Sequence, residues 1–199
     1  MKHFFNPENG FWQIFGVIGD LLILSMLWTV CSVPLVTTGA ASCALYDAVA
    51  AGFRRHEQEY LQRFFQTFRR ELKSSLLPTL LCGAVLAAAF CCFRALAGRS
   101  LLLAAIGLAL LLLPLGTVCW VFPLLSRFTL GFRALLGNAL RLALGHAPSS
   151  CALAAGLVLV LWLTLRLALL PLFLLPALFA LYCTLFLEPV FHQYETAGR

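Results

Sequence analysis

The sequence predicts an all-α integral membrane protein, with a bundle of about six membrane-embedded helices, two amphipathic cytoplasmic helices and a weak internal repeat. The prediction rests on composition: 62% of the 199 residues are hydrophobic, only 11% are charged, and the mean hydropathy is +0.94. A soluble domain carries roughly 25% charged residues. Fourteen basic and eight acidic side chains are too few to cover a soluble chain of this length. The apolar surplus is therefore expected to face lipid, and residues 1–199 are expected to form a single membrane domain.

The first membrane segment is expected at residues 11–35, because an apolar run of roughly 20 residues crosses about 30 Å of hydrocarbon. We expect this run to be retained rather than cleaved, since Asp20 interrupts it and no A-x-A-type site follows. Pro34 separates it from a weaker apolar segment, 36–53, which is rich in Ala, Ser, Thr and Gly. Small residues let membrane helices pack closely. The sequence leaves open whether this second segment crosses the bilayer or forms a re-entrant hairpin.

The later apolar runs predict four further spans, at residues 75–97, 100–126, 149–165 and 167–187. The last two belong to one stretch of 39 residues, which as a single helix would be roughly 58 Å long. Because that length exceeds one crossing, we expect a hairpin that turns near Arg166.

The two polar stretches, 54–73 and 127–146, are predicted to be amphipathic helices. Aromatic and leucine residues recur in the first with helical spacing, while arginines and glutamates occupy the other side. Such a helix either lies at the membrane surface or docks on a partner. The candidate residues for this cytoplasmic interface are Phe64, Phe65, Phe68, Arg69 and Arg70.

The distribution of basic residues predicts the orientation. Nine Lys and Arg residues lie in the two polar stretches, and three lie in the opposite connections, at Arg94, Arg99 and Arg166. Both polar stretches and the C-terminus are therefore expected to be cytoplasmic. The internal repeat would relate Phe64–Pro78 to Leu135–Pro148, since each runs from an amphipathic helix through a proline into an apolar span.

No pattern of metal ligation, cofactor binding or catalysis is visible, so we expect no cofactor and no enzymatic activity. The eight cysteines lie in apolar segments without a CxxC spacing, and the four histidines are scattered. The basic residues cluster between apolar runs, which favours lipid headgroups over nucleic acid as their partner.

The intramembrane polar candidates are Asp20, Thr37, Thr38, Tyr46 and Asp47. Asp20 lies well inside the first predicted span, where an ionised carboxylate facing lipid is costly. We therefore expect it to face the bundle interior, with the hydroxyls of Thr37, Thr38 and Ser42 as its nearest partners. Both a structural role and an ion-handling role remain open for this carboxyl group.

Segments along the whole chain resemble the YesL family of bacterial membrane proteins, a domain of unknown function. They are NPENGFW at Asn6–Trp12, Gly19–Asp20, Leu27–Trp28, CSVPLVTTGAASCALYDA at Cys31–Ala48, Phe64–Arg70, FPLLSRF at Phe122–Phe128 and EPVFHQYE at Glu188–Glu195. The resemblance implies a multi-pass protein of the bacterial cytoplasmic membrane. Members of this family are often encoded beside carbohydrate ABC transporters, and no catalytic residues are established for it.

The leading functional hypothesis is a non-enzymatic accessory component associated with carbohydrate uptake. Its expected partners are the lipid bilayer and either ABC transporter subunits or a second copy of the chain. The alternative is a small transporter or channel in its own right, working as a homodimer, which Asp20 and the proline-broken helices favour. A membrane-embedded enzyme is disfavoured, because His, Asp and Glu do not cluster at an interface.

Overall fold

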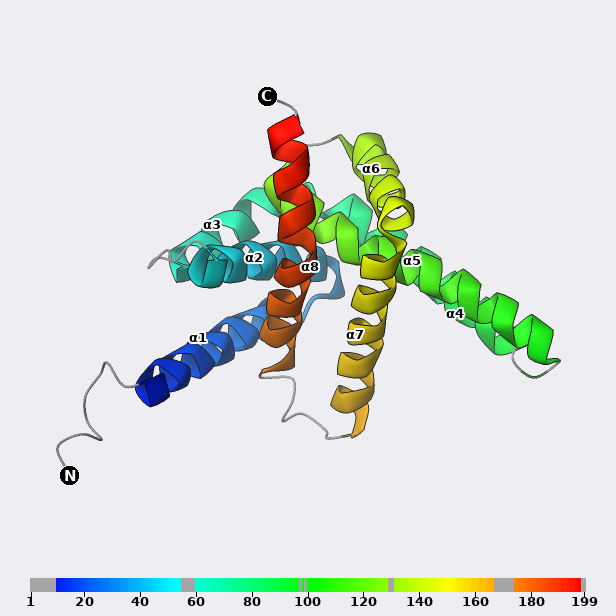
Figure 1. Cartoon of the computed structure of the whole chain (residues 1–199), viewed down its shortest axis with the longest axis horizontal. Coiled ribbons are helices and arrows are strands. Elements are labelled where there is room, and N and C mark those ends of the chain that lie inside the picture. Colours follow the sequence, from blue (N-terminus) through cyan, green and yellow to red (C-terminus); the bar gives the residue numbers. More distant parts are fainter. Residues whose placement is uncertain are drawn as a thin grey trace.

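The computed structural model describes residues 10–54, 60–96, 98, 100–128, 131–166 and 174–197. Across these residues all regular structure is helical (Figure 1). The eight α-helices are α1 (Gly10–Cys31), α2 (Thr38–Val49), α3 (Tyr60–Glu71), α4 (Leu76–Leu96), α5 (Leu101–Arg127), α6 (Phe132–Gly145), α7 (Ala147–Arg166) and α8 (Leu175–Ala197). A 3-10 turn, Leu35–Thr37, precedes α2, and a π-helical turn, Ala50–Arg54, follows it.

Within the described part of the chain, three helical stretches are long and apolar enough to cross a membrane: Leu76–Leu96, Leu101–Arg127 and Ala147–Thr164. Apolar helical stretches in α1 and α8, Ile18–Cys31 and Leu175–Phe191, are shorter. Most side chains of the three long stretches are not buried inside the chain. Because apolar helices with uncovered faces are suited to lipid rather than water, they indicate a membrane protein.

α2 is the centre of the packing. Its residues from Gly39 to Val49 are buried, apart from half-buried Ser42, so protein surrounds this helix on nearly every side. One apolar cluster joins α2 to α4, α5, α6, α7 and α8, and a second joins it to α1, α3 and α8. The small side chains of α2 allow these helices to approach closely. At Gly39, an added Cβ would lie 1.9 Å from the Thr79 Oγ1 of α4 and 2.9 Å from the Phe122 ring of α5.

α4 and α5 form a hairpin that projects away from the other helices (Figure 1). Ser100 begins α5 as an N-cap, and its Oγ accepts a hydrogen bond of 3.3 Å from the Leu103 N–H. The two helices approach closely at Gly107, where an added Cβ would lie 3.2 Å from the Phe93 Cα. Leu101, at the tip, is 90% exposed. The outer part of this hairpin thus presents apolar side chains that the rest of the chain does not cover.

The first and last helices are joined by Ser25 of α1. Its hydroxyl donates to the Leu174 carbonyl at 3.4 Å and accepts a hydrogen bond of 3.1 Å from the Ala177 N–H. The first N–H groups of a helix have no partner within it, so Ser25 satisfies one of these donors in α8 from another helix. Leu21 and Leu24 are buried in the same apolar cluster as Ala177. The bundle is therefore closed by contacts between its two ends.

Candidate functional site

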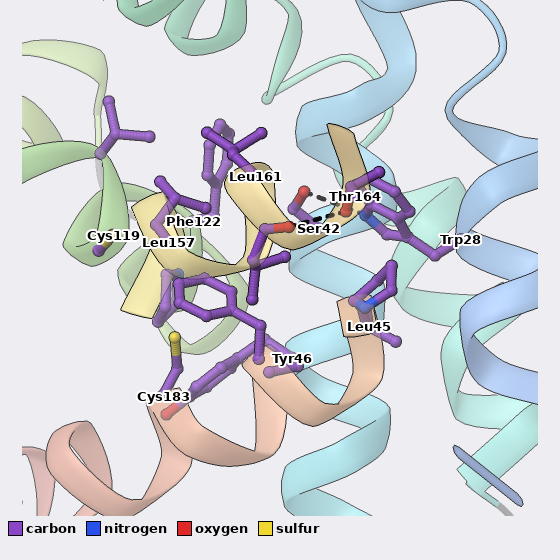
Figure 2. Close-up of a pocket in the computed structure, with 16 residues that line it drawn as sticks. Trp28, Ser42, Leu45, Tyr46, Cys119, Phe122, Leu157, Leu161, Thr164 and Cys183 are labelled. Carbon is purple, nitrogen blue, oxygen red and sulfur yellow. Dashed lines mark hydrogen bonds between the residues drawn. The ribbon is translucent and has the colours of Figure 1, made fainter. Parts of the chain in front are cut away.

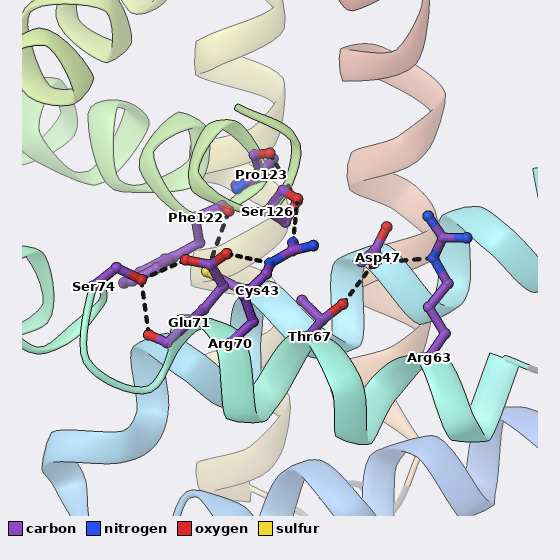
Figure 3. Close-up of polar contacts among 10 residues, drawn as sticks. All are labelled: Cys43, Asp47, Arg63, Thr67, Arg70, Glu71, Ser74, Phe122, Pro123 and Ser126. Atoms are coloured by element: carbon purple, nitrogen blue, oxygen red, sulfur yellow. Dashed lines mark hydrogen bonds and ion pairs between the residues drawn. The ribbon is translucent and has the colours of Figure 1, made fainter. Parts of the chain in front are cut away.

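The carboxylate of Asp47 fastens α3 to α2. Asp47 is buried, and its Oδ2 accepts hydrogen bonds from the Thr67 Oγ1 at 2.8 Å and from the Arg63 Nε at 3.1 Å (Figure 3). Thr67 is also buried, whereas the Arg63 side chain is 35% exposed. The buried hydroxyl and the guanidinium together compensate the cost of removing the carboxylate from water. Asp47, a candidate from the sequence, is thus the central acceptor of a contact between two helices.

Glu71 and Arg70 connect the end of α3 to the end of α5. The Arg70 Nη2 donates to the Ser126 carbonyl at 3.0 Å, and its Nε lies 2.7 Å from the Glu71 Oε1 (Figure 3). The buried Glu71 also accepts a hydrogen bond from the Ser74 hydroxyl. A cation at the last carbonyls of a helix complements its dipole. Arg70, which the sequence offers as an interface residue, therefore stabilises the C-terminal end of α5.

A second ion pair joins α5 to α8. The Arg127 Nη2 lies 2.5 Å from the Glu188 Oε1, and the two side chains are only 10% and 18% exposed. The Arg127 guanidinium also lies over the Phe191 ring, 5.8 Å from its centroid. The Tyr46 hydroxyl of α2 donates to the same Glu188 oxygen at 3.5 Å. Tyr46 was a sequence candidate, whereas Arg127 and Glu188 were not.

Asp20 is bonded differently from what the sequence predicts. Its Oδ1 accepts a hydrogen bond of 2.5 Å from the Tyr60 hydroxyl at the start of α3. Thr37 and Thr38, expected as its partners, donate instead to backbone carbonyls beside them. Ser42, the third expected partner, accepts a hydrogen bond from an indole N–H of α1. Burial, together with the hydrogen bond to Asp20 and its charge, raises the pKa of Tyr60 to about 12.

The remaining candidates of α3 lie on opposite sides of the helix. Phe64 is fully buried and stacks on the half-buried Phe68, with ring centroids 6.3 Å apart. Phe65 is 46% exposed, and Arg69 is exposed as well. We call the exposed side the outer face of α3, and its members recur at helical spacing: Gln62, Phe65, Gln66 and Arg69.

A cavity of about 260 Å³ lies beside Tyr46, between α1, α2, α5, α7 and α8 (Figure 2). Most of its lining is apolar, and the Tyr46 ring forms part of its wall. Its lining also includes the thiols of Cys119 and Cys183 and the hydroxyls of Ser42 and Thr164. No motif in the sequence indicates this cavity, because its lining residues come from five helices and share no spacing along the chain.

The described residues contain no group of three His, Cys, Asp or Glu side chains that could hold a metal ion. The eight cysteines are free thiols. The contacts described above for Asp47, Arg70 and Glu188 are hydrogen bonds and ion pairs between helices.

In comparison with known proteins, part of the chain matches one protein family. Residues 21–91 match the family described as "Protein of unknown function, DUF624". The matched region runs from within α1 through α2 and α3 into α4, and so contains Asp47, Arg70 and Glu71. No curated protein and no solved structure matches the chain. Over roughly a third of its length, the chain is thus similar to a family whose function is unknown.

Proposed function

We propose that this chain is a non-enzymatic accessory component of the bacterial cytoplasmic membrane that assists carbohydrate uptake by binding subunits of an ABC transporter. The supporting observation is the way in which α3 is held. Asp47 and Arg70 fix one side of this helix to α2 and α5, while Phe65 and Arg69 on the other side remain exposed. A rigid helix with an uncovered aromatic ring beside a cation has the composition of a protein-binding surface.

The connection with carbohydrate uptake rests on the resemblance to the YesL family. The match over residues 21–91 supports a relation to a family of unknown function, and it includes the whole of α3. In this proposal α1, α2, α4, α5, α7 and α8 are the six membrane-embedded helices, whereas α3, α6 and the C-terminus are cytoplasmic. By position, α3 then resembles the short helices through which permease subunits engage their ATPases, a comparison that is an analogy.

Orientation is testable at Gln62, an exposed residue of α3. In a cysteine-free background, Gln62→Cys should react with an impermeant thiol reagent in inverted vesicles but not in intact cells. Labelling from outside intact cells would contradict the proposed orientation.

The alternative proposal is a small transporter or channel that works as a homodimer. The Asp20 carboxylate within the first apolar helix, with its hydrogen bond from Tyr60, is the observation in its favour. The cavity argues against a path for sugars, because most of its wall is apolar and it has few hydroxyl groups, among them those of Ser42 and Thr164. A sugar needs many hydrogen bonds to replace those it makes with water.

The two proposals differ in what the protein binds, so purification from the native host in a mild detergent separates them. We expect permease or ATPase subunits to co-purify in stoichiometric amounts, and Phe65→Ala with Arg69→Glu to abolish this. Arg133→Glu is the matched control, because it makes the same charge change at an exposed position of α6. A homo-oligomer without ABC subunits would overturn the accessory proposal and favour the transporter.

A further inference from the structure

The main polar groups in the lining of the cavity each already make a hydrogen bond within the protein. The Trp28 Nε1 donates to the Ser42 Oγ at 3.3 Å, and the Thr164 Oγ1 donates to the Val160 carbonyl of its own helix at 2.8 Å. The Tyr46 hydroxyl donates to Glu188. Because these groups already have partners in the protein, the cavity offers a ligand mainly apolar contact. It is therefore suited to a hydrocarbon.

The size of the cavity narrows the class of occupant. An apolar cavity of about 150 Å³ is large enough for benzene, and this one measures about 260 Å³. An α-helix is about 10 Å in diameter with its side chains, which is too wide for such a space. A flexible chain of several methylene groups fits. Leaving the space empty would forfeit dispersion contacts and be unfavourable.

The cavity borders the outer apolar surface of α7. Leu161 lines the cavity (Figure 2) and is also 53% exposed, so the wall at this residue reaches the surface. Its neighbours along α7, Leu159 and Trp162, are 59% and 53% exposed and do not line the cavity. α7 is one of the helices long and apolar enough to cross a membrane. Acyl chains of the bilayer would therefore lie directly beside Leu161.

From these observations we infer that the cavity binds one acyl chain of a membrane phospholipid, which enters laterally beside Leu161. The acyl chain then lies against Leu157 and Leu161 of α7 on one side and Tyr46 and Cys183 on the other. It is held by apolar contact alone. A lipid in this position bridges α2, α7 and α8 and acts as part of the core. This inference is independent of the partner proposed above.

The test uses a phospholipid with a photoactivatable diazirine near the end of one acyl chain. The protein is reconstituted into vesicles that contain this probe and is then irradiated. The labelled residues are identified by peptide mass spectrometry. We expect label on interior residues such as Tyr46 and Cys183 as well as on the lipid-facing residues of α7. Leu161→Trp should reduce the interior label several-fold by filling the entrance. Leu159→Trp is the matched control, since it is exposed on the same helix but does not line the cavity, and it should leave the interior label unchanged.

Label confined to lipid-facing residues such as Leu159 and Trp162 would overturn the inference. Equal interior label in the two tryptophan variants would also overturn it, because entry would then not occur beside Leu161. A third arm replaces the probe by a free fatty acid with the same diazirine. Interior label from the fatty acid but not from the phospholipid would refute the assignment to a membrane phospholipid. A second variant, Ala180→Leu, reduces the cavity from its interior and should lower the label without changing the entrance.

Discussion

Replacing Gly39 by alanine should destabilise the bundle, although alanine is the better helix former. Gly39 lies in the first turn of α2, where this helix meets α4 and α5. A methyl group there would lie 1.9 Å from the Thr79 Oγ1 and 2.9 Å from the Phe122 ring. Both distances are well below the roughly 3.5–4.0 Å at which carbon atoms attract each other. Either the Thr79 and Phe122 side chains or the helices themselves must move.

The size of the effect is the difference between two terms. Overpacking of a well-packed interior costs about 1–3 kcal/mol. Alanine in place of glycine within a helix contributes roughly 0.5–1 kcal/mol in the opposite direction. The net loss should therefore be up to about 2.5 kcal/mol, which lowers Tm by up to about 10 °C for a chain of this size.

Thermal unfolding in detergent, followed by tryptophan fluorescence, measures this loss. The control is Gly83→Ala in α4, where an added Cβ meets nothing within 4 Å, and Tm should be unchanged or slightly raised. Thr79→Ala in the Gly39→Ala background should restore part of the stability, because it removes the nearest atom. A double-mutant cycle on Gly39 and Thr79 then gives their coupling energy. The reasoning is refuted if Gly39→Ala is as stable as Gly83→Ala, or if that coupling energy is zero.

Three further predictions concern the polar contacts of Asp47, Tyr60 and Glu188. Asp47→Ala should loosen α3, since it leaves a buried hydroxyl unpaired at a cost of about 1–3 kcal/mol, and amide hydrogen exchange in residues 60–71 should quicken more than in Asp47→Asn. Ultraviolet titration should show a phenol that ionises at about pH 12 and is absent in Tyr60→Phe, and Asp20→Asn should lower this pKa towards 10. Because the folded pKa is raised, the associated stability is present below about pH 10 and is lost as pH rises to about 12. Arg127→Ala and Glu188→Ala should each cost up to about 3–5 kcal/mol, and thermal unfolding of the double variant should show a loss smaller than their sum.

Each prediction has an outcome that contradicts it. Unchanged exchange in Asp47→Ala would mean that apolar contacts alone hold α3. A Tyr60 pKa unaffected by Asp20→Asn would rule out the carboxylate as a cause of the shift. Strictly additive losses for Arg127 and Glu188 would argue that the pair contributes nothing beyond its separate side chains.

The helical class and the long apolar helices could be predicted because each depends on a local property. α4, α5 and α7 are recognisable from length and hydrophobicity alone, and lipid requires both. The fate of segment 36–53 could not be predicted in the same way. Its Gly and Ala residues are compatible with several environments, and only the packing of other helices around Gly39–Val49 makes it a central helix.

The polar contacts were less predictable, since they join residues distant in the chain. Asp20 was recognised as an unusual carboxylate, but its partner Tyr60 reaches it only because α3 folds back towards α1. Glu71 belongs to a polar, charged segment and is indistinguishable there from a hydrated residue, although it is buried. Glu188 directly follows the last predicted span, 167–187. Its lone position among apolar residues was the available signal for a buried ion pair.

The link between Ser25 and the start of α8 has a consequence for the order in which the protein is assembled. The hairpin of α4 and α5 is built from neighbours in the chain, so it can form while later residues are still being synthesised. α1 cannot complete its packing until the start of α8 has been synthesised, because the backbone groups that Ser25 contacts lie 149 and 152 residues further along. Closing so long a loop is slow compared with forming local contacts. α1 is therefore made before the hairpin but is among the last of the described helices to reach its packed position, and a chain truncated before α8 would lack these contacts to α1.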